Sequence, residues 1–359
     1  MTELLSKLRK QAREESPEIL LPEAEDTRVL EAAARVGESG IAQPVVLGRS
    51  EAVRRVADKN DITLDNVRIL DPSEEQIDEY AAIYADLRDV PHEIAAEMLN
   101  DELVLGGVIT RVGDVDGLVA GAVNSSADVV AVANGVVGFH PTVDTGSSFF
   151  VMVFDRKDVG ENGVLLFADC GVNIAPSDEQ LADIAVSTAN TAENLFGWTP
   201  RVALLSYSTK GSASHETVEK IQRTAELARQ QRGSIIIDGE LQVDAALVPD
   251  VAEKKTDDSA LIRGDANVLI FPDLQAGNIA YKISERLAGA TALGPVLQGY
   301  ARPISDLSRG ASADDIVDVI TVTAAMAAAD PGTSAGDIVT SGALNRRESS
   351  SSLQPVNTE

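Results

Sequence analysis

Cysteine and histidine are scarce in this sequence. Among 359 residues there are one cysteine, Cys170, and three histidines, His92, His140 and His215. A single cysteine cannot form a disulfide within the chain, and the histidines are not at the spacing of metal ligands. We therefore expect no metal site built from histidine or cysteine, and the cysteine count gives no sign of an oxidising compartment.

Basic and aromatic residues are also few. Lys and Arg number 30 against 57 Asp and Glu, which gives a formal net charge of -27. Nucleic acid is not expected as a partner, because phosphate contacts need clustered Lys or Arg. Acid spread along the chain is typical of a surface adapted to concentrated salt, where the Debye length falls to about 3 Å at 1 M. We therefore expect a halophilic, archaeal source. With only 4% aromatic residues, aliphatic side chains must fill the interior.

The sequence lacks a long uninterrupted apolar run. The Val- and Ala-rich stretch 117–139 contains polar residues such as Asn124 and Asp128, which argues against a membrane span. The first 19 residues are charged and have no apolar core, so we predict no signal peptide. We expect a cytoplasmic protein with no membrane partner.

Short apolar runs alternate with amphipathic helical stretches. At roughly 150 residues per domain, the length suggests two domains, and 44% hydrophobic residues indicate a globular chain. The predicted helices are 2–15, 27–36, 51–59, 75–87, 92–112, 177–196 and 214–232. The predicted strands are 19–22, 44–48, 67–70, 117–123, 148–154, 164–168, 202–207, 235–239 and 268–271. Continuous apolar strands separated by helices predict an α/β fold with mostly parallel sheets covered on both faces.

Three segments depart from this alternation. The strands 148–154 and 164–168 flank the polar turn 158–163 and are predicted to form a hairpin. Segment 249–263 is charged and is predicted to be an exposed excursion, and the residues beyond 330 read as a tail.

The segment 305–316 combines a hydroxyl, a guanidinium and carboxylates in a loop that opens a helix. A helix N-terminus attracts anions, and Arg309 can bind a phosphate through two parallel hydrogen bonds. A structural interpretation is also available, because Ser312 and Asp315 have the spacing of a capping box. The predicted helix then runs through Met326.

Three other segments follow predicted strands. Segment 206–212 has the composition of a phosphate loop but not the spacing of a nucleotide P-loop, so a turn with a helix cap is the simpler interpretation. Segment 124–128 could bind an anion or cap a helix. Segment 271–282 places Lys282 one turn into a helix, where lysines are usually solvated. No Gly-x-Gly-x-x-Gly follows a strand, so the dinucleotide fingerprint is absent.

Seven segments, taken together and in order, carry a family resemblance. They are 167–170, 206–213, 238–246, 267–273, 277–282, 294–299 and 306–310. In order and spacing they resemble the phosphate acetyl/butyryltransferase family, over roughly residues 15–330. Each segment alone is a weak signal, whereas the set is specific.

The resemblance implies reversible transfer of acetyl between acetyl phosphate and coenzyme A, in acetate metabolism. It implies two three-layer α/β/α domains with a cleft between them, similar to the isocitrate and isopropylmalate dehydrogenase fold, and a homodimer. We place the first domain at 1–143 with a returning segment at 293–332, because Ser308 to Asp315 must face the middle of the chain. The second domain is placed at 144–292 and a flexible tail at 333–359.

The family's catalytic serine, arginine and aspartate correspond to Ser308, Arg309 and Asp315. The coenzyme A thiol is mostly protonated at neutral pH, so Asp315 would remove its proton as general base. Ser308 would hydrogen-bond the sulfur or the developing oxyanion, and Arg309 would hold the phosphate. The resemblance implies no metal and no prosthetic group, with coenzyme A as a substrate.

The resemblance also suggests residues that bind substrate. These are Arg88, Ser125, Ser126, Asp128, Asn278, Tyr281 and Lys282. One departure stands out, because Ala131 occupies a position where the family commonly has an arginine. A missing cation there would cost about 1.5 to 3 kcal/mol of binding free energy, the value of a charged hydrogen bond.

Three alternatives to acetyl transfer stay open at this point. One is a phosphate butyryltransferase, which a panel of acyl phosphates would separate. Another is a hydroxyacid dehydrogenase on the same scaffold, although its metal-binding aspartates and nucleotide motif are not evident. The third is a catalytically silent paralogue, which the alanine at position 131 suggests.

Overall fold

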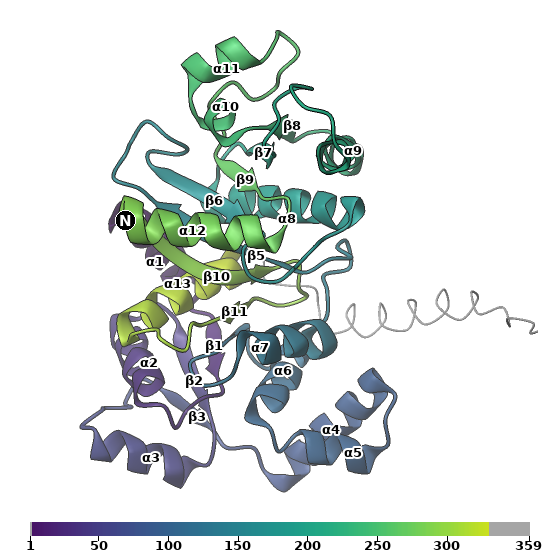
Figure 1. Cartoon of the computed structure of the whole chain (residues 1–359). Helices are drawn as coiled ribbons and strands as arrows, with labels where there is room; N and C mark the ends of the chain where they lie inside the picture. Colours follow the sequence, from purple (N-terminus) through teal and green to yellow (C-terminus); the bar gives the residue numbers. More distant parts are fainter. Residues whose placement is uncertain (1, 330–359) are drawn as a thin grey trace, which may run out of the picture.

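The computed structural model describes residues 2–329 of the chain (Figure 1). In this part an eleven-stranded sheet runs through the molecule in the order β3-β2-β1-β4-β11-β10-β5-β6-β9-β7-β8. Helices cover both faces of the sheet. The predicted tail 333–359 and the last residues of the predicted returning segment lie outside the described residues.

The elements of the first half are strands separated by one or more helices. They are α1 (Thr2–Glu15), β1 (Glu18–Leu21), α2 (Thr27–Ser39), β2 (Gln43–Leu47), α3 (Ser50–Lys59), β3 (Arg68–Leu70), α4 (Glu74–Arg88), α5 (His92–Met98), α6 (Glu102–Val112), β4 (Gly117–Ala120), α7 (Ser126–Val132) and the π-helix η1 (Ala133–Val137).

The second half continues with the remaining strands and helices of the described residues. It contains β5 (Ser147–Val153), β6 (Val164–Ala168), α8 (Asp178–Phe196), β7 (Arg201–Leu205), α9 (Glu216–Gln231), β8 (Ile236–Leu241), α10 (Val243–Leu247), α11 (Pro249–Lys255), β9 (Val268–Ile270), α12 (Leu274–Ala288), β10 (Thr291–Gln298), β11 (Ile304–Asp306) and α13 (Ala313–Ala329).

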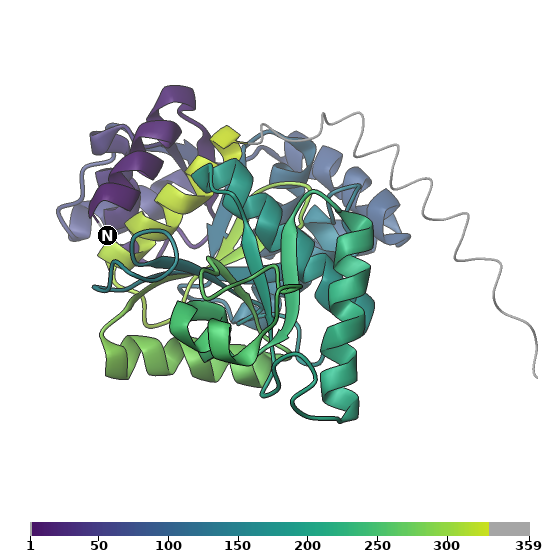
Figure 2. The same cartoon turned by 90° about the horizontal axis from the view of Figure 1, so that it is seen from above.

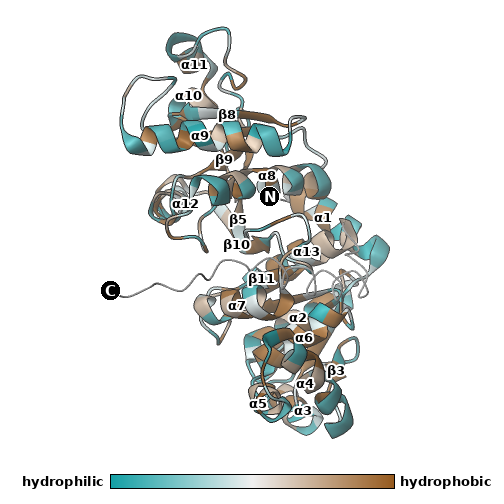
Figure 3. Cartoon of the chain, turned by 90° about the vertical axis from the view of Figure 1, so that its right-hand side faces the viewer, coloured by the Kyte–Doolittle hydropathy of each residue, from teal (hydrophilic) through white to brown (hydrophobic). Residues whose placement is uncertain are grey.

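Burial of the strands on both faces explains their continuous apolar runs. Every residue of β4, β5, β6 and β9 is buried. Such runs are expected where helices cover a parallel sheet on both sides. In Figure 3 the strands β8 and β9 are brown, whereas outer helices such as α3 carry teal, hydrophilic residues. The predicted α/β fold of mostly parallel strands is confirmed.

Strand β10 joins the two halves of the sheet. Seven of the ten neighbouring strand pairs are parallel, and β10 is antiparallel to both β5 and β11. The predicted hairpin of β5 and β6 is confirmed, since these strands pair antiparallel. Because β10 begins at Thr291, it spans the predicted start of the returning segment at 293. The domain boundaries themselves stay a prediction.

Three predictions of secondary structure were wrong or incomplete. The helix expected at 92–112 is two helices, because Asp101 accepts hydrogen bonds from the amides of Leu103 (2.8 Å) and Val104 (3.3 Å) and starts a new one. Segment 249–263 contains α11 and buries Ile262. Strands β10 and β11 were not predicted, since Gly294 and Pro295 interrupt the first and the second has three residues.

The arrangement of α12 and α13 around β10 creates the site. Helix α13 packs against α1, α2 and β10, and α12 packs against β6 and β10. Figure 2 shows α12, in light green, along an outer edge of the molecule. The parallel strands β1, β4 and β11 direct their carboxyl ends to one edge, where ligands of α/β proteins usually bind. No helix in residues 2–329 is long and apolar enough to cross a membrane.

Candidate active site

The loop between β11 and α13 is held at both ends and open in the middle. Leu307 is buried, and its amide donates to the Ala120 carbonyl of β4 at 2.7 Å. Ser308, Arg309 and Gly310 are exposed. The loop closes where the amide of Ala311 donates to the Ser308 carbonyl at 2.8 Å. Hydrogen bonds therefore fix the two ends of the loop, and Ser308 and Arg309, which have the predicted catalytic chemistry, lie exposed between them.

Asp315 lies in the first turn of α13 and takes part in a capping box. Its Oδ2 atom accepts hydrogen bonds from the Ser312 amide (2.8 Å) and hydroxyl (2.7 Å). The Asp315 amide donates in return to Ser312 Oγ at 3.2 Å. The structural interpretation of this spacing is confirmed. The carboxylate is also exposed, and its Oδ1 atom accepts no hydrogen bond within the described residues, so a role toward a ligand remains open to it.

Helix α12 faces the loop between β11 and α13. Tyr281 stacks on Phe150 of β5, with ring centroids 4.2 Å apart. Burial, with smaller contributions from Cys170 and Glu285, raises the pKa of the Tyr281 hydroxyl above its ordinary value. Lys282 is exposed, and its ammonium lies 5.7 Å from the Tyr281 ring centroid.

A cavity of about 550 Å³ lies between the loop and α12. Its lining includes four of the predicted site residues: Ser308, Asp315, Tyr281 and Lys282. Its apolar side consists of Phe150, Ala292, Leu293, Pro295, Leu307, Ala311 and Val319. Glu285 and Arg286 of α12 add a carboxylate and a second cation. A cavity with cations on one wall and an apolar surface beside them suits an anion that carries a small apolar group.

Arg286 was missed by the sequence analysis. It lies four residues after Lys282 on α12, so both cations share one helix face. That spacing was the signal that could have identified it.

Arg309 stands on the same loop, between two residues that line the cavity. Its side chain is exposed, and its guanidinium forms no hydrogen bond or ion pair with any residue in 2–329. The backbone carbonyl of Arg309 accepts a hydrogen bond from the Arg28 side chain at 2.9 Å. The guanidinium is thus available to a ligand.

Five of the seven predicted binding residues do not line this cavity, and two of these, Arg88 and Asn278, make contacts elsewhere. Arg88, in the last turn of α4, donates to the Gly135 carbonyl of η1 at 3.2 Å. Asn278 donates to the Cys170 carbonyl at 3.2 Å and so fastens α12 to the end of β6. Neither is among the residues that line the cavity beside Ser308.

The loop before α7 is a helix cap. Ser125 donates through its hydroxyl to Asp128 Oδ2 at 2.6 Å, and the Asp128 amide donates to Ser125 Oγ at 3.3 Å. The Ser125 hydroxyl holds the pKa of Asp128 below its ordinary value. Ser126 and Ala131 are exposed on the same helix. Of the two interpretations of this segment, the structure favours the cap.

The backbone amides that follow β4 could bind an anion, and they bind the carboxylate of Glu23 from the same chain. Glu23 is 8% exposed and accepts hydrogen bonds of 2.8 to 3.1 Å from four consecutive amides, 121–124. The Asn124 side chain adds another at 3.0 Å. These amides are therefore not available to a substrate.

Loop 206–212 is organised in the same way. Glu240, 1% exposed, accepts hydrogen bonds from the Gly211 amide (2.7 Å) and the Ser208 hydroxyl (3.0 Å). Burial alone would raise the pKa of Glu240, but these hydrogen bonds and one from Gln222 leave it below the ordinary value. The loop resembles a phosphate site in composition because it binds an internal anion.

Asp306 is a buried carboxyl that the sequence analysis did not single out. It ends β11, is 2% exposed, and its Oδ1 atom has no hydrogen-bond partner within the described residues. Burial raises its pKa to about 6, against the hydrogen bond from Ser126 and with a further contribution from Glu23. Because β11 was not predicted, the sequence analysis had no signal for a buried carboxyl at its end.

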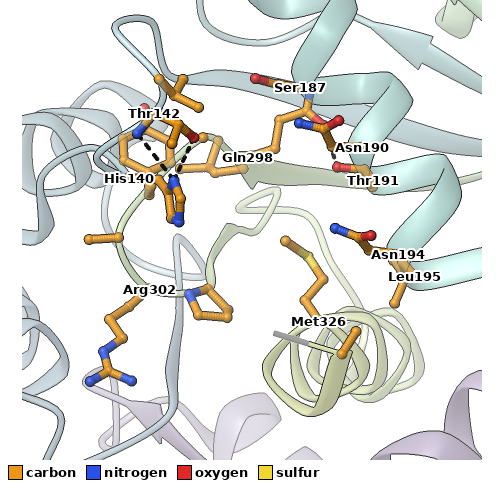
Figure 4. A pocket seen from close by; sticks show the side chains of 17 residues that line it. His140, Thr142, Ser187, Asn190, Thr191, Asn194, Leu195, Gln298, Arg302 and Met326 are labelled. Carbon is orange, nitrogen blue, oxygen red and sulfur yellow. Dashed lines mark hydrogen bonds between the residues drawn. The ribbon is translucent and has the colours of Figure 1, made fainter. Parts of the chain in front are cut away.

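A second, smaller cavity of about 200 Å³ lies where α8, α13 and the β10–β11 connection meet (Figure 4). Hydroxyl and amide side chains of α8, including Asn190, Thr191 and Asn194, line one side, and Met326 of α13 lies opposite. None of the predicted site residues lines it. Across the residues that the structure describes, no group of three or more His, Cys, Asp or Glu is placed to hold a metal ion.

The fold and the cavity beside Ser308 define a class: an α/β protein built on one mostly parallel sheet, whose cavity presents cations, a hydroxyl and a carboxylate beside an apolar wall. Comparison with known proteins narrows this class. The family model described as phosphate acetyl/butaryl transferase matches residues 3–324. The chain therefore belongs to the phosphate acetyl/butaryl transferase family.

Individual relatives agree with this assignment. A phosphate acetyltransferase from Thermoanaerobacterium thermosaccharolyticum is 47% identical over 90% of this chain and 99% of its own length. The crystal structure of a phosphotransacetylase from Streptococcus pyogenes is similar with a TM-score of 0.86 and 38% identity, over 91% of this chain and 98% of that one. A 4-hydroxythreonine-4-phosphate dehydrogenase from Klebsiella pneumoniae shares the fold at 11% identity and a TM-score of 0.50, over 86% and 98%.

Proposed function

We propose that this protein is a phosphate acetyltransferase, which transfers acetyl between acetyl phosphate and coenzyme A with release or uptake of phosphate. The observation that carries the proposal is the cavity that places Ser308 and Asp315 opposite Tyr281 and Lys282. The family assignment over residues 3–324 supports it. Coenzyme A and acetyl phosphate are the substrates that follow.

The loop between β11 and α13 would carry the chemistry. The free Oδ1 atom of Asp315 would take the proton of the coenzyme A thiol, and the thiolate would then attack the acetyl carbonyl. Ser308 would donate to the oxyanion that develops on this carbonyl. Arg309 would hold the phosphate and neutralise the charge that it gains as it leaves. These roles need no metal and no prosthetic group.

The apolar wall would accept the acyl group. Phe150, Leu293 and Pro295 line the cavity beside the catalytic loop. Rates with acetyl, propionyl and butyryl phosphate would measure how long a chain this wall accommodates. Butyryl phosphate as the best substrate would make the protein a phosphate butyryltransferase, whereas no turnover with any of the three would favour a silent paralogue.

Arg309→Gln tests the phosphate assignment. Gln keeps a polar side chain but loses the charge and the two parallel hydrogen bonds, so we expect a higher KM for acetyl phosphate and a lower kcat. Steady-state kinetics with each substrate varied in turn would measure both. Arg156→Gln is a suitable control, because Arg156 is an exposed arginine that pairs with Asp158 in the turn between β5 and β6 and does not line the cavity. Equal kinetics in the two variants would contradict the assignment.

The homodimer is the second part of the proposal, and α12 offers a surface for it. Ile279, Ile283 and Leu287 are 56%, 52% and 82% exposed and recur every four residues, which places them on one helix face. Helix α12 has two cations and one anion, a net charge of 2 - 1 = +1, in a chain of charge -27. A second copy approaching through this face would meet no net negative charge on the helix itself, although the chain as a whole is strongly acidic. A twofold axis near Ile283 would also bring each helix against its own copy.

Light scattering on Ile283→Asp tests this interface. We expect a dimer for the unchanged protein and a monomer for the variant, because the new carboxylate would be buried without a partner. Ile94→Asp, at a 47% exposed isoleucine of α5, is the control and should remain dimeric. A monomeric unchanged protein, or a dimeric Ile283→Asp, would contradict the proposal.

A further inference from the structure

Arg28, in the first turn of α2, connects the start of its own helix with the segment after β4 and the loop before α13. Its Nη1 atom donates to the carbonyls of Arg309 (2.9 Å) and Ala311 (2.8 Å). Its Nη2 atom donates to the Ala122 carbonyl at 3.0 Å, at the end of β4. The Asp26 carboxylate accepts hydrogen bonds from Arg28 Nε at 3.1 Å and from Arg28 Nη2 at 2.8 Å.

These five hydrogen bonds use all five N–H groups of the guanidinium. No donor is left for a substrate phosphate, although the side chain is 34% exposed. The positive charge of Arg28 is also paired within the chain, with the carboxylate of Asp26. Burial raises the pKa of Asp26, but the hydrogen bonds and charge of Arg28 outweigh it and leave that pKa below its ordinary value. The donors and the charge of Arg28 are thus all used in contacts within its own chain.

The two loop carbonyls that Arg28 binds flank Gly310, within the exposed part of the catalytic loop. Apart from Arg28, the backbone of this segment is held by the hydrogen bond from the Leu307 amide to Ala120, by the turn from Ala311 to Ser308, and by the Gly310 amide, which donates to Ser308 Oγ at 3.3 Å. We propose that Arg28 is a positioning residue, which fixes the loop carrying Ser308 and Arg309 against β4 and α2 and does not bind substrate. This inference rests on the proposed function, because it concerns the same loop.

A lysine could not replace this arginine. Its ammonium has three donors around one nitrogen and cannot reach carbonyls on separate loop residues and a carboxylate together. Unpaired carbonyls would allow the loop to shift, and a displacement of about 1 Å at reacting groups can cost on the order of a hundredfold in rate. The effect should fall on catalysis more than on affinity for coenzyme A.

Kinetics of Arg28→Lys test the proposal. We expect kcat to fall at least about tenfold and KM for acetyl phosphate to rise several-fold, while KM for coenzyme A stays within about twofold. Arg35→Lys is the matched control, since Arg35 lies seven residues later on α2 and pairs with Glu31 and Asp314 instead of loop carbonyls. It should retain the kinetic constants of the unchanged protein.

Asp26→Asn gives a second, milder variant in case Arg28→Lys does not fold. Asn caps a helix about as well as Asp, so α2 is preserved while the carboxylate partner of Arg28 is lost. We expect a smaller fall in kcat of the same kind. The proposal is overturned if kcat is unchanged in folded Arg28→Lys, or in Asp26→Asn where the first variant is unfolded. It is also overturned if KM for coenzyme A alone rises. Absence of activity in the unchanged protein would instead overturn the proposed function.

Discussion

At the residue scale, Asp315 has two roles that a pair of variants can separate. Asp315→Asn keeps an oxygen that can accept from Ser312 but removes the base, so kcat should fall by about 10² to 10⁴ with little change in Tm. Ser312→Ala removes the hydroxyl of the cap and keeps the base, so stability should fall by about 1 kcal/mol with kcat retained. Kinetics and thermal melts on both variants check this. If Asp315→Asn lowers only Tm, the residue is a helix cap and nothing more.

Asp306 makes a prediction about pH. Its folded pKa of about 6 lies above the ordinary 3.8 of aspartate, so between these values the unfolded carboxyl loses its proton first. The free energy of unfolding therefore falls as pH rises from about 4 to 6, by roughly 2 to 3 kcal/mol, and then levels off. Asp306→Asn should remove this loss.

Urea unfolding at pH 5 and pH 8 measures the effect. The stability gained by Asp306→Asn should be larger at pH 8 than at pH 5 by about 1 kcal/mol, because roughly half of the loss occurs above pH 5. Parallel pH dependences of the variant and the unchanged protein would show that Asp306 titrates normally.

The sequence identified residues by chemical type, and the structure sorted them by location. Ser308 and Asp315 could be placed together because they lie seven residues apart where a loop opens a helix, and Tyr281 and Lys282 because they share one helix. The link from Arg28 to the loop could not be found in this way, since its partners there are carbonyls some 280 positions away in the chain. Every residue has a backbone carbonyl, so the type of side chain does not show which carbonyl will accept a hydrogen bond. The carboxylates Glu23 and Glu240 escaped notice because many of their donors are backbone amides.

At the element scale, the position of α12 depends on Gly277. A Cβ atom on this residue would lie 2.3 Å from the Asp169 carbonyl oxygen, so Gly277→Ala must push the helix away from β6. Because the predicted substrate-binding residues Tyr281 and Lys282 follow on the same helix, we expect a several-fold rise in the KM of the substrates together with a lower Tm.

Gly233→Ala is the control for this substitution. The nearest atom to a Cβ at Gly233 is the Arg229 carbonyl oxygen, at an ordinary contact distance of 3.6 Å. Its kinetics and Tm should match those of the unchanged protein. If Gly277→Ala behaves in the same way, α12 has more freedom than its packing indicates.

Long periodic elements were predicted well, and short or interrupted ones were not. Helices such as α8 and α9 and fully buried strands such as β5 carry their pattern over many residues. Strand β11 has three residues, of which two are polar, and is a strand because β4 and β10 hydrogen-bond to it. Its existence is a tertiary effect that local sequence does not encode. The single continuous sheet depends on β10, which was missed for a similar reason.

At the scale of the whole molecule, the net charge of -27 makes stability depend on salt. Repulsion between carboxylates acts over the Debye length, about 10 Å at 0.1 M and about 3 Å at 1 M. We expect Tm to rise markedly between 0.1 M and 1 M KCl and more slowly above. Thermal melts across this series provide the measurement, and an unchanged Tm up to 3 M would contradict the expectation of a halophilic protein.

Thioester formation from acetyl phosphate and coenzyme A tests the central claim most directly. The purified, full-length protein would be assayed at about 2 to 3 M KCl, where the acidic surface is screened. The account predicts turnover in the ordinary enzyme range of about 1 to 10³ s⁻¹, with Ala131 tolerated. A demonstrably folded protein that forms no acetyl thioester under these conditions would contradict it.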